Sequence, residues 1–234
     1  MRRFMAILLC AVMLCGMAAA DELPFVVRNG DRDKPYIAIT VDDCFDKEYA
    51  RKIFELCVSY NVPVTFFPLG NQLKQKDADL WQAMAASPLV EIGSHTQNHT
   101  SWKNMHRDGI NMHVYRFQES LDAVLGYHYQ IKSLRPPYGH TSGKNVSQEG
   151  VKKILARYDI QHVILWDVSQ TNASKAIKQV KNGSILLYHA RKKDYNCLVK
   201  LIPMLLEKGF VPVTVSTLLG FGDIATSTDI YVHE

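Results

Sequence analysis

The feature that most constrains the fold is a regular alternation of short apolar runs with amphipathic segments along most of the chain. The apolar runs are rich in β-branched residues and predict strands, and the segments between them carry apolar residues at helical spacing. We therefore expect strands at residues 36–41, 62–69, 89–92, 131–134, 162–168, 184–188 and 211–215, and helices at residues 47–60, 78–86, 111–127, 149–158, 174–180 and 196–208.

Nearly continuous apolar strands separated by helices favour a parallel sheet covered by helices, an α/β fold. The pattern fits an open doubly wound sheet and a closed or nearly closed barrel equally well. In both architectures the carboxyl ends of the strands meet at one edge, and the loops there carry function.

The first twenty residues differ from the rest of the chain. Arg2 and Arg3 form a basic start, residues 4–17 are apolar, and residues 18–20 are all alanine. This pattern predicts a cleaved signal peptide and a secreted or cell-envelope protein without a stable membrane span; an uncleaved anchor is the alternative. We divide the chain into a signal peptide at 1–20, an N-terminal linker at 21–33, a single α/β domain at 34–220 and a C-terminal tail at 221–234.

Charge and cysteine content narrow the class of protein. Two of the 27 Lys and Arg residues leave with the signal, against 23 acidic residues, and no basic cluster remains. Nucleic acid is therefore not an expected partner. Cys44, Cys57 and Cys197 remain, an odd number that allows at most one disulfide, so we expect the hydrophobic core to stabilise the fold.

Polar side chains recur at the predicted carboxyl ends of the strands, which indicates one shared site. They are Asp42 and Asp43, His95 and His99, Arg135 with Pro137 and Tyr138, Trp166, and His189. Asp43, His95 and His99 supply one carboxylate and two imidazoles, and the four-residue spacing of the histidines would bring both rings to one side of a helical turn. Such a set leaves coordination positions open, as a catalytic site for zinc or a similar divalent metal requires. The alternative is a pair of surface histidines on a polar loop.

The adjacent acids Asp42 and Asp43 follow a buried strand, where a carboxylate without partners is costly. The pair therefore indicates a cation, a network of donors or a reaction that it serves.

Five motifs appear in order on this frame: TVDD (40–43), HTQNH (95–99), RPPYG (135–139), WDVSQTN (166–172) and LLYH (186–189). Over residues 34–219 the chain resembles the NodB-homology polysaccharide deacetylases of carbohydrate esterase family 4. The resemblance implies a distorted (β/α)7 barrel in a single domain. It also implies a metal-dependent hydrolase that removes N- or O-acetyl groups from polysaccharides.

The resemblance also implies a role for each site residue. Asp43, His95 and His99 would hold a divalent metal, Zn²⁺ first, with Co²⁺ and Ni²⁺ as alternatives. The others would act in catalysis: Asp42 as general base, Arg135 orienting Asp42, the Tyr138 backbone N–H stabilising the oxyanion, and His189 as general acid. Trp166 and Pro137 are predicted to line a sugar groove.

The chain departs from the family pattern at two places. Cys44 stands where a glycine usually follows the two acids, and its thiol could compete as a soft ligand. Asn172 and Ala173 stand where the family has Asp-Trp, so the acid that usually pairs with the general-acid histidine is missing. Asp167 is a candidate to replace it.

Three hypotheses follow. The first is a deacetylase of an exported polysaccharide, with N-acetylglucosamine of peptidoglycan as the first substrate and chitin-like oligomers or acetylated xylan as alternatives. The second is an attenuated family member that binds metal and carbohydrate without efficient turnover, which the Asn172 departure favours. The third is a metal-dependent hydrolase of another bond, such as an amide in a small molecule.

Overall fold

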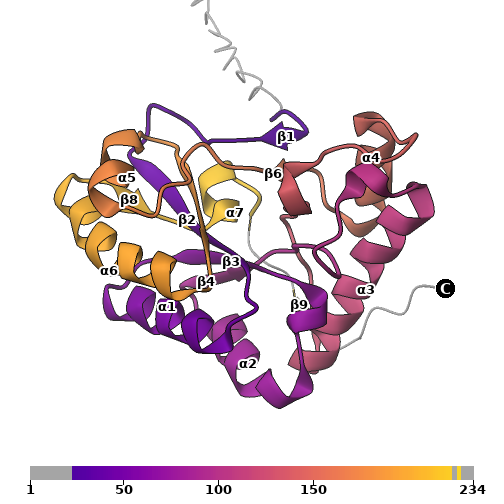
Figure 1. The fold of residues 1–234 in the computed structure, drawn as a ribbon, viewed down its shortest axis with the longest axis horizontal. Coiled ribbons are helices and arrows are strands. Elements are labelled where there is room, and N and C mark those ends of the chain that lie inside the picture. The colour runs from indigo at the N-terminus through magenta and orange to yellow at the C-terminus, as the bar shows by residue number, and fades with distance from the viewer. Residues whose placement is uncertain (1–22, 223–225, 228–234) are drawn as a thin grey trace, which may run out of the picture.

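The computed structural model describes residues 23–222 and 226–227 (Figure 1). The predicted signal peptide and most of the predicted tail lie outside the described residues. Within the described ranges, no helix combines the length and the apolarity that crossing a membrane requires.

Five parallel strands form the main sheet, as the alternating pattern predicted. Its order is β4 (Val90–Ile92), β3 (Val64–Pro68), β2 (Tyr36–Asp43) and β7 (Ile185–His189), and β8 (Val211–Pro212) pairs with the start of β2. β2 is the longest strand and pairs with three others, so its two terminal acids lie at the centre of the sheet's carboxyl edge.

Isolated parallel bridges connect the segments between β4 and β7, the two ends of the main sheet. Ser94 bridges to Leu134, Leu134 bridges to Val163 at the start of β6 (Val163–Ile164), and Val168 bridges to Leu186. β1 (Val26–Val27) pairs with β6 from outside this path. The strands therefore close into a distorted barrel, which confirms the predicted fold.

Three predicted strands are wrong in extent, and the one predicted at residues 162–168 is regular only over the two residues of β6. Residues 131–134 form only bridges through Leu134. The two prolines that follow Arg135 lack the N–H groups that would extend the pairing beyond it. The predicted strand at 211–215 ends at Pro212, and Val215 already begins a helix whose first turn is capped by the Thr214 side chain.

Among the described residues, helices α1 to α6 lie around the strands, and α7 lies near the middle of the view in Figure 1. The helices are α1 (Lys47–Ser59), α2 (Ala78–Ala86), α3 (Arg107–Leu125), α4 (Gln148–Leu155), α5 (Ala173–Gln179), α6 (Lys192–Glu207) and α7 (Val215–Leu219). Short 3₁₀ turns lie at Gly70–Gln72, Gln75–Asp77, Trp102–Asn104, Pro137–Gly139 and Ala156–Tyr158, and β5 (His128–Tyr129) pairs with β9 (Thr226–Ser227). Both α3 and α6 begin four residues before their predicted starts.

Alternation along β2 separates two hydrophobic cores. Ile37, Ile39 and Val41 pack into the larger cluster, which also contains the buried faces of the outer helices. Ala38 belongs instead to a smaller cluster with residues of α7. Because side chains alternate along a strand, Thr40 and Asp42 share the inner face with Ala38. The pattern of the strand therefore turns Asp42 toward the inside of the barrel.

Candidate metal centre and active site

The predicted site residues meet at the carboxyl edge of the sheet. In the register of the strands, Asp42 pairs with His189 on β7 and Asp43 pairs with Pro68 on β3. His189 is also on the alternation that points inward along β7. The sheet thus brings the two acids and the histidine together from segments that are about 150 residues apart in the sequence.

The backbone after Asp42 makes a tight turn with two residues in left-handed conformations. Asp43 has φ +65° and Cys44 has φ +57°, and the Cys44 N–H donates to the Asp42 carbonyl oxygen at 2.8 Å. Non-glycine residues adopt positive φ at a cost, and such strain concentrates at functional sites. The turn directs the Asp43 side chain away from the inner face of β2, toward the histidines.

Cys44 is not part of the ligand cluster formed by the described residues. Its side chain is fully buried in the larger hydrophobic core, and burial raises the pKa of the thiol well above its usual range. The Lys47 ammonium group donates to the Cys44 carbonyl oxygen at 2.7 Å. The prediction of a competing soft ligand is therefore wrong for this conformation, because the protonated thiol packs into the core.

Asp43, His95 and His99 form a cluster with the geometry of a metal site. One potential ligand atom of each residue lies within 4.8 Å of those of the other two. The Nε2 atoms of His95 and His99 lie 3.3 and 3.4 Å from Asp43 Oδ1. This oxygen is buried and accepts no hydrogen bond from the described residues.

The tautomer of His95 shows that this set fits a cation. His95 Nδ1 lies 2.7 Å from the Arg135 carbonyl oxygen, which can only accept, so Nδ1 carries the proton. In the neutral ring, Nε2 then presents a lone pair toward Asp43. A carboxylate oxygen without a donor, facing an imidazole lone pair, is the arrangement that a divalent cation between them would stabilise.

The loop that carries the histidines is not helical, contrary to the prediction. Residues 95–99 follow β4 as a bend, and Thr96 has φ +66°. The Thr96 N–H donates to Ser94 Oγ at 3.1 Å, and the His95 N–H donates to the Pro68 carbonyl oxygen at 3.0 Å. These bonds, rather than a helical turn, bring the two rings to the same side, with ring centroids 5.4 Å apart.

The electrostatics of the cluster favour an ionised Asp43. Burial raises the pKa of Asp43, but the neighbouring His95, His189 and His99 more than offset this, so its pKa lies below the usual value. Burial lowers the pKa of His99, which favours its neutral form. A charged carboxylate and a neutral imidazole are the forms that bind metals.

Arg135 fixes Asp42. Its guanidinium is completely buried and donates to Asp42 Oδ1 at 2.6 Å and to Thr40 Oγ1 at 2.7 Å. It also donates to the carbonyl oxygens of Ile164 and Leu165, and lies 4.5 Å from the centre of the Phe67 ring. With Oδ1 bound to Arg135, Asp42 Oδ2 faces the histidine cluster, 3.9 Å from His95 Nε2.

His189 and Tyr138 complete the edge. His189 Nε2 lies 3.9 Å from Asp43 Oδ2, and the ring is partly exposed. Tyr138 has φ +61° within the turn that follows Arg135, and its ring makes an edge contact with His99 at 4.5 Å between centroids. The Tyr138 side chain is 61% exposed and therefore borders the metal cluster from the solvent side.

Trp166 and Pro137, the two residues predicted to line a sugar groove, differ from each other in exposure. Trp166 is partly exposed, and its ring lies 5.7 Å from the Arg135 guanidinium. Pro137 is buried and offers little surface to a sugar. Sequence reasoning missed Phe45, which is 55% exposed and lies 6.4 Å from the His99 ring. An aromatic residue directly after the acid turn was the available signal.

Neither Asn172 nor Asp167 accompanies His189. Asn172 caps α5 by accepting from the Lys175 N–H at 3.0 Å. Asp167 accepts from the Ile185 N–H at 2.8 Å and forms an ion pair with Arg32. Ile185 and His189 are four residues apart on β7, or about 13 Å. The prediction that Asp167 replaces the missing acid is therefore wrong.

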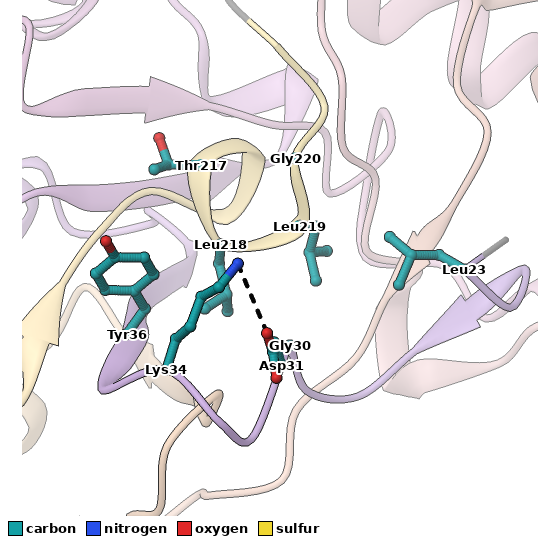
Figure 2. Close-up of a pocket in the computed structure, with 9 residues that line it drawn as sticks. All are labelled: Leu23, Gly30, Asp31, Lys34, Tyr36, Thr217, Leu218, Leu219 and Gly220. Carbon is teal, nitrogen blue, oxygen red and sulfur yellow. Dashed lines mark ion pairs between the residues drawn. The ribbon is translucent and has the colours of Figure 1, made fainter. Parts of the chain in front are cut away.

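A separate pocket of about 260 Å³ lies at the other end of β2 (Figure 2). An ion pair of 3.6 Å between Lys34 and Asp31 stands at its wall. Its lining residues are Leu23, Gly30, Asp31, Lys34, Tyr36, Thr217, Leu218, Leu219 and Gly220. Since Tyr36 is the first residue of β2 and Asp42 is near its end, about 20 Å of strand separates this pocket from the metal cluster.

Known proteins resemble the chain in sequence and in structure. Residues 29–163 match the family model described as polysaccharide deacetylase. A peptidoglycan-N-acetylglucosamine deacetylase of Bacillus cereus is 27% identical over 197 residues, which cover 81% of this chain and 70% of the relative.

Two solved structures show the same fold. One is a peptidoglycan N-acetylglucosamine deacetylase in complex with a hydroxamic-acid-type benzamide; it has a TM-score of 0.73 and 25% identity, covering 84% of this chain and 93% of its own. The other is a carbohydrate esterase family 4 pseudoenzyme from Bacillus anthracis, with a TM-score of 0.72 and 21% identity, covering 85% of this chain and 70% of its own.

Proposed function

The chain belongs to the polysaccharide deacetylase family, carbohydrate esterase family 4, and on that premise we propose that it removes N-acetyl groups from an exported glycan, with N-acetylglucosamine of peptidoglycan as the first substrate. The observation that carries the proposal is the pairing of a buried, donor-free Asp43 oxygen with two imidazoles, next to an Asp42 fixed by Arg135. The predicted signal peptide supports a substrate outside the cell membrane.

Asp43, His95 and His99 would hold a divalent metal, Zn²⁺ first and Co²⁺ or Ni²⁺ as alternatives, and the bound metal would polarise the acetyl carbonyl and acidify the attacking water. Asp42 Oδ2 accepts the proton of that water as it attacks. Arg135 occupies Oδ1 and keeps the carboxylate oriented during this transfer. The general base therefore has one oxygen for position and one for chemistry.

His189 and Tyr138 act on the other half of the reaction. The Tyr138 N–H donates to the oxygen that becomes negative as the acetyl carbon turns tetrahedral. His189 donates a proton to the glucosamine nitrogen as the C–N bond breaks, and acetate and the free amine are the products. The register that pairs His189 with Asp42 sets the acid and the base on neighbouring strands of the same edge.

The exposed rings of Phe45 and Tyr138 lie near His99 and provide aromatic surface beside the cluster. Aromatic faces suit the apolar faces of pyranose rings, so these two side chains and the exposed part of Trp166 are the proposed contacts for the glycan.

A second candidate function is an attenuated family member that binds metal and glycan with little turnover. The observation that favours it is Asn172, which caps α5 in place of the missing acid. Both candidates predict a metal ion bound by Asp43, His95 and His99, so the rate of acetate release distinguishes them.

The test is acetate release by the purified protein from peptidoglycan fragments and from N-acetylglucosamine oligomers, with Zn²⁺, Co²⁺ or Ni²⁺ added. We expect acetate from the wild type. Asp42→Asn should reduce the rate by about 10²- to 10⁴-fold while the bound metal, measured by elemental analysis, is retained.

Three results would contradict the first proposal in different ways. Metal binding without acetate from any polymer supports the attenuated member. A hydrolysis product without acetate supports cleavage of another bond. Unchanged acetate release by Asp42→Asn excludes Asp42 as the base.

A further inference from the structure

A buried acid outside the five motifs lies behind His189. Asp194 is in the first turn of α6, and its side chain is 2% exposed. Asp194 Oδ1 accepts from the His189 backbone N–H at 3.2 Å and lies 3.9 Å from His189 Nδ1. Asp194 Oδ2 forms an ion pair with Arg191 Nε at 3.0 Å.

The His189 ring is therefore flanked by two carboxylates with different functions. Nε2 faces Asp43 on the metal side, and Nδ1 faces Asp194 on the protein side. The short turn between β7 and α6 sets this arrangement, because the Arg191 N–H donates to the His189 carbonyl oxygen at 2.8 Å. The hydrogen bond from the His189 N–H to Asp194 connects the end of β7 to the start of α6.

We propose that Asp194 is the positioning residue of His189 and takes the role of the acid that is absent at Asn172. This inference rests on the proposed deacetylase function. At 3.9 Å from Nδ1, the negative charge of Asp194 favours a proton on that nitrogen, so the proton that His189 gives to the leaving amine comes from Nε2, which faces the reacting group. Asp194 touches neither substrate nor metal, so it acts only through the histidine.

The proposal predicts a selective loss of activity. Asp194→Asn keeps an oxygen that can accept from the His189 backbone N–H, and it removes the negative charge next to Nδ1 of the ring. We expect kcat for acetate release from the N-acetylglucosamine oligomer to fall by about 10- to 100-fold with KM unchanged. Hydrolysis of 4-nitrophenyl acetate should fall much less, because its leaving group departs without a proton.

A double-mutant cycle separates positioning from a structural role. In the His189→Ala background, Asp194→Asn should cause no further loss on the oligomer, since its only route to the reaction has been removed. If Asp194→Asn lowers the rate by the same factor in the wild type and in His189→Ala, the proposal is overturned. Asp167→Asn is the matched control, a charge removed from the far end of β7, and should affect both substrates equally.

Asn172→Asp tests the same idea from the position of the missing acid. Because Asp194 already faces Nδ1, we expect this variant to change the rate by no more than about twofold. A large gain would show that His189 lacks a partner in the wild type and would overturn the inference.

One measurement does not depend on turnover. NMR of the His189 ring nitrogens at alkaline pH should show the proton on Nδ1 in the wild type and a mixture of tautomers in Asp194→Asn. The same tautomer in both proteins would contradict the inference. A wild type that releases no acetate would instead contradict the proposed function and leave this comparison intact.

Discussion

Glu91 on β4 and Asp43 at the end of β2 are acids of the same sheet, and the fold treats them in opposite ways. Glu91 is 1% exposed and accepts from four neutral donors: Thr65 Oγ1, Ser133 Oγ, and the N–H and Oγ of Ser216. Asp43 has one buried oxygen that accepts no hydrogen bond from any residue that the structure describes. A carboxylate whose oxygens all accept hydrogen bonds stabilises the fold, whereas one with a free oxygen that faces imidazoles can bind a cation.

The pKa directions of the two acids follow the same division. Burial raises the pKa of Glu91 above its usual value, and its neutral donors only partly offset that cost. Burial also raises the pKa of Asp43, but three histidines bring it below the usual value. The environment of Glu91 thus tolerates a proton, while the environment of Asp43 favours a negative charge that a metal can use.

The largest effect that tests this comparison is expected from Asp43→Asn. Loss of a ligand should reduce metal affinity and acetate release by at least about 100-fold, the upper range for changes to groups that merely support a ligand. The metal-free protein should keep its stability within about 0.5 kcal/mol, since asparagine tolerates the positive φ of this position.

Isothermal titration with Zn²⁺ and urea unfolding of the metal-free protein measure the two quantities. A large loss of stability in the metal-free variant would show that Asp43, like Glu91, holds structure together, and the contrast between the two acids would fail.

Sequence alone predicted the parts of this contrast that depend on local pattern. The apolar, β-branched run at residues 36–41 predicted the strand that ends in the two acids, and the polar residues at the strand ends brought Asp43 together with His95 and His99. It did not predict that the ring closes through single bridges at Leu134, because strand pairing over long separations leaves no local periodicity. It also placed 95–99 on a helical turn, where positive φ at Thr96 makes a bend instead.

The acids behind the site were the hardest to predict. Glu91 sits within an apolar strand without a motif, and its donors come from β3, from the segment before Arg135 and from α7. Asp194 reads as an ordinary acid in the first turn of a helix. Only the three-dimensional structure shows that Glu91 accepts four hydrogen bonds and that Asp194 lies next to His189.

A smaller effect, on stability rather than on activity, is expected from Glu91→Ala. The change leaves four buried donors without their acceptor and frees the start of α7 from the sheet, so we expect a loss of about 3 kcal/mol. Acetate release by the protein that remains folded should be unchanged, since Glu91 lies one layer of the barrel below Asp42.

Urea unfolding gives the free energy, and Glu55→Ala, an exposed acid on α1, is the control expected to stay within about 0.5 kcal/mol. A Glu91→Ala variant that is fully stable yet inactive would reverse the assignment of the two acids.

The smallest effect is the pH dependence that Glu91 adds to stability. Its folded pKa is raised above the ordinary 4.5, so the folded protein binds the proton more tightly than the unfolded chain does. Stability is therefore greatest below about pH 4.5 for this group and decreases as pH rises through the folded pKa, by about 1.4 kcal/mol for each unit of the shift. Glu91→Gln keeps the shape and cannot ionise. Subtracting its unfolding free energy from that of the wild type across this range isolates the contribution, and a difference that grows with pH would mean that the four donors stabilise the charged form.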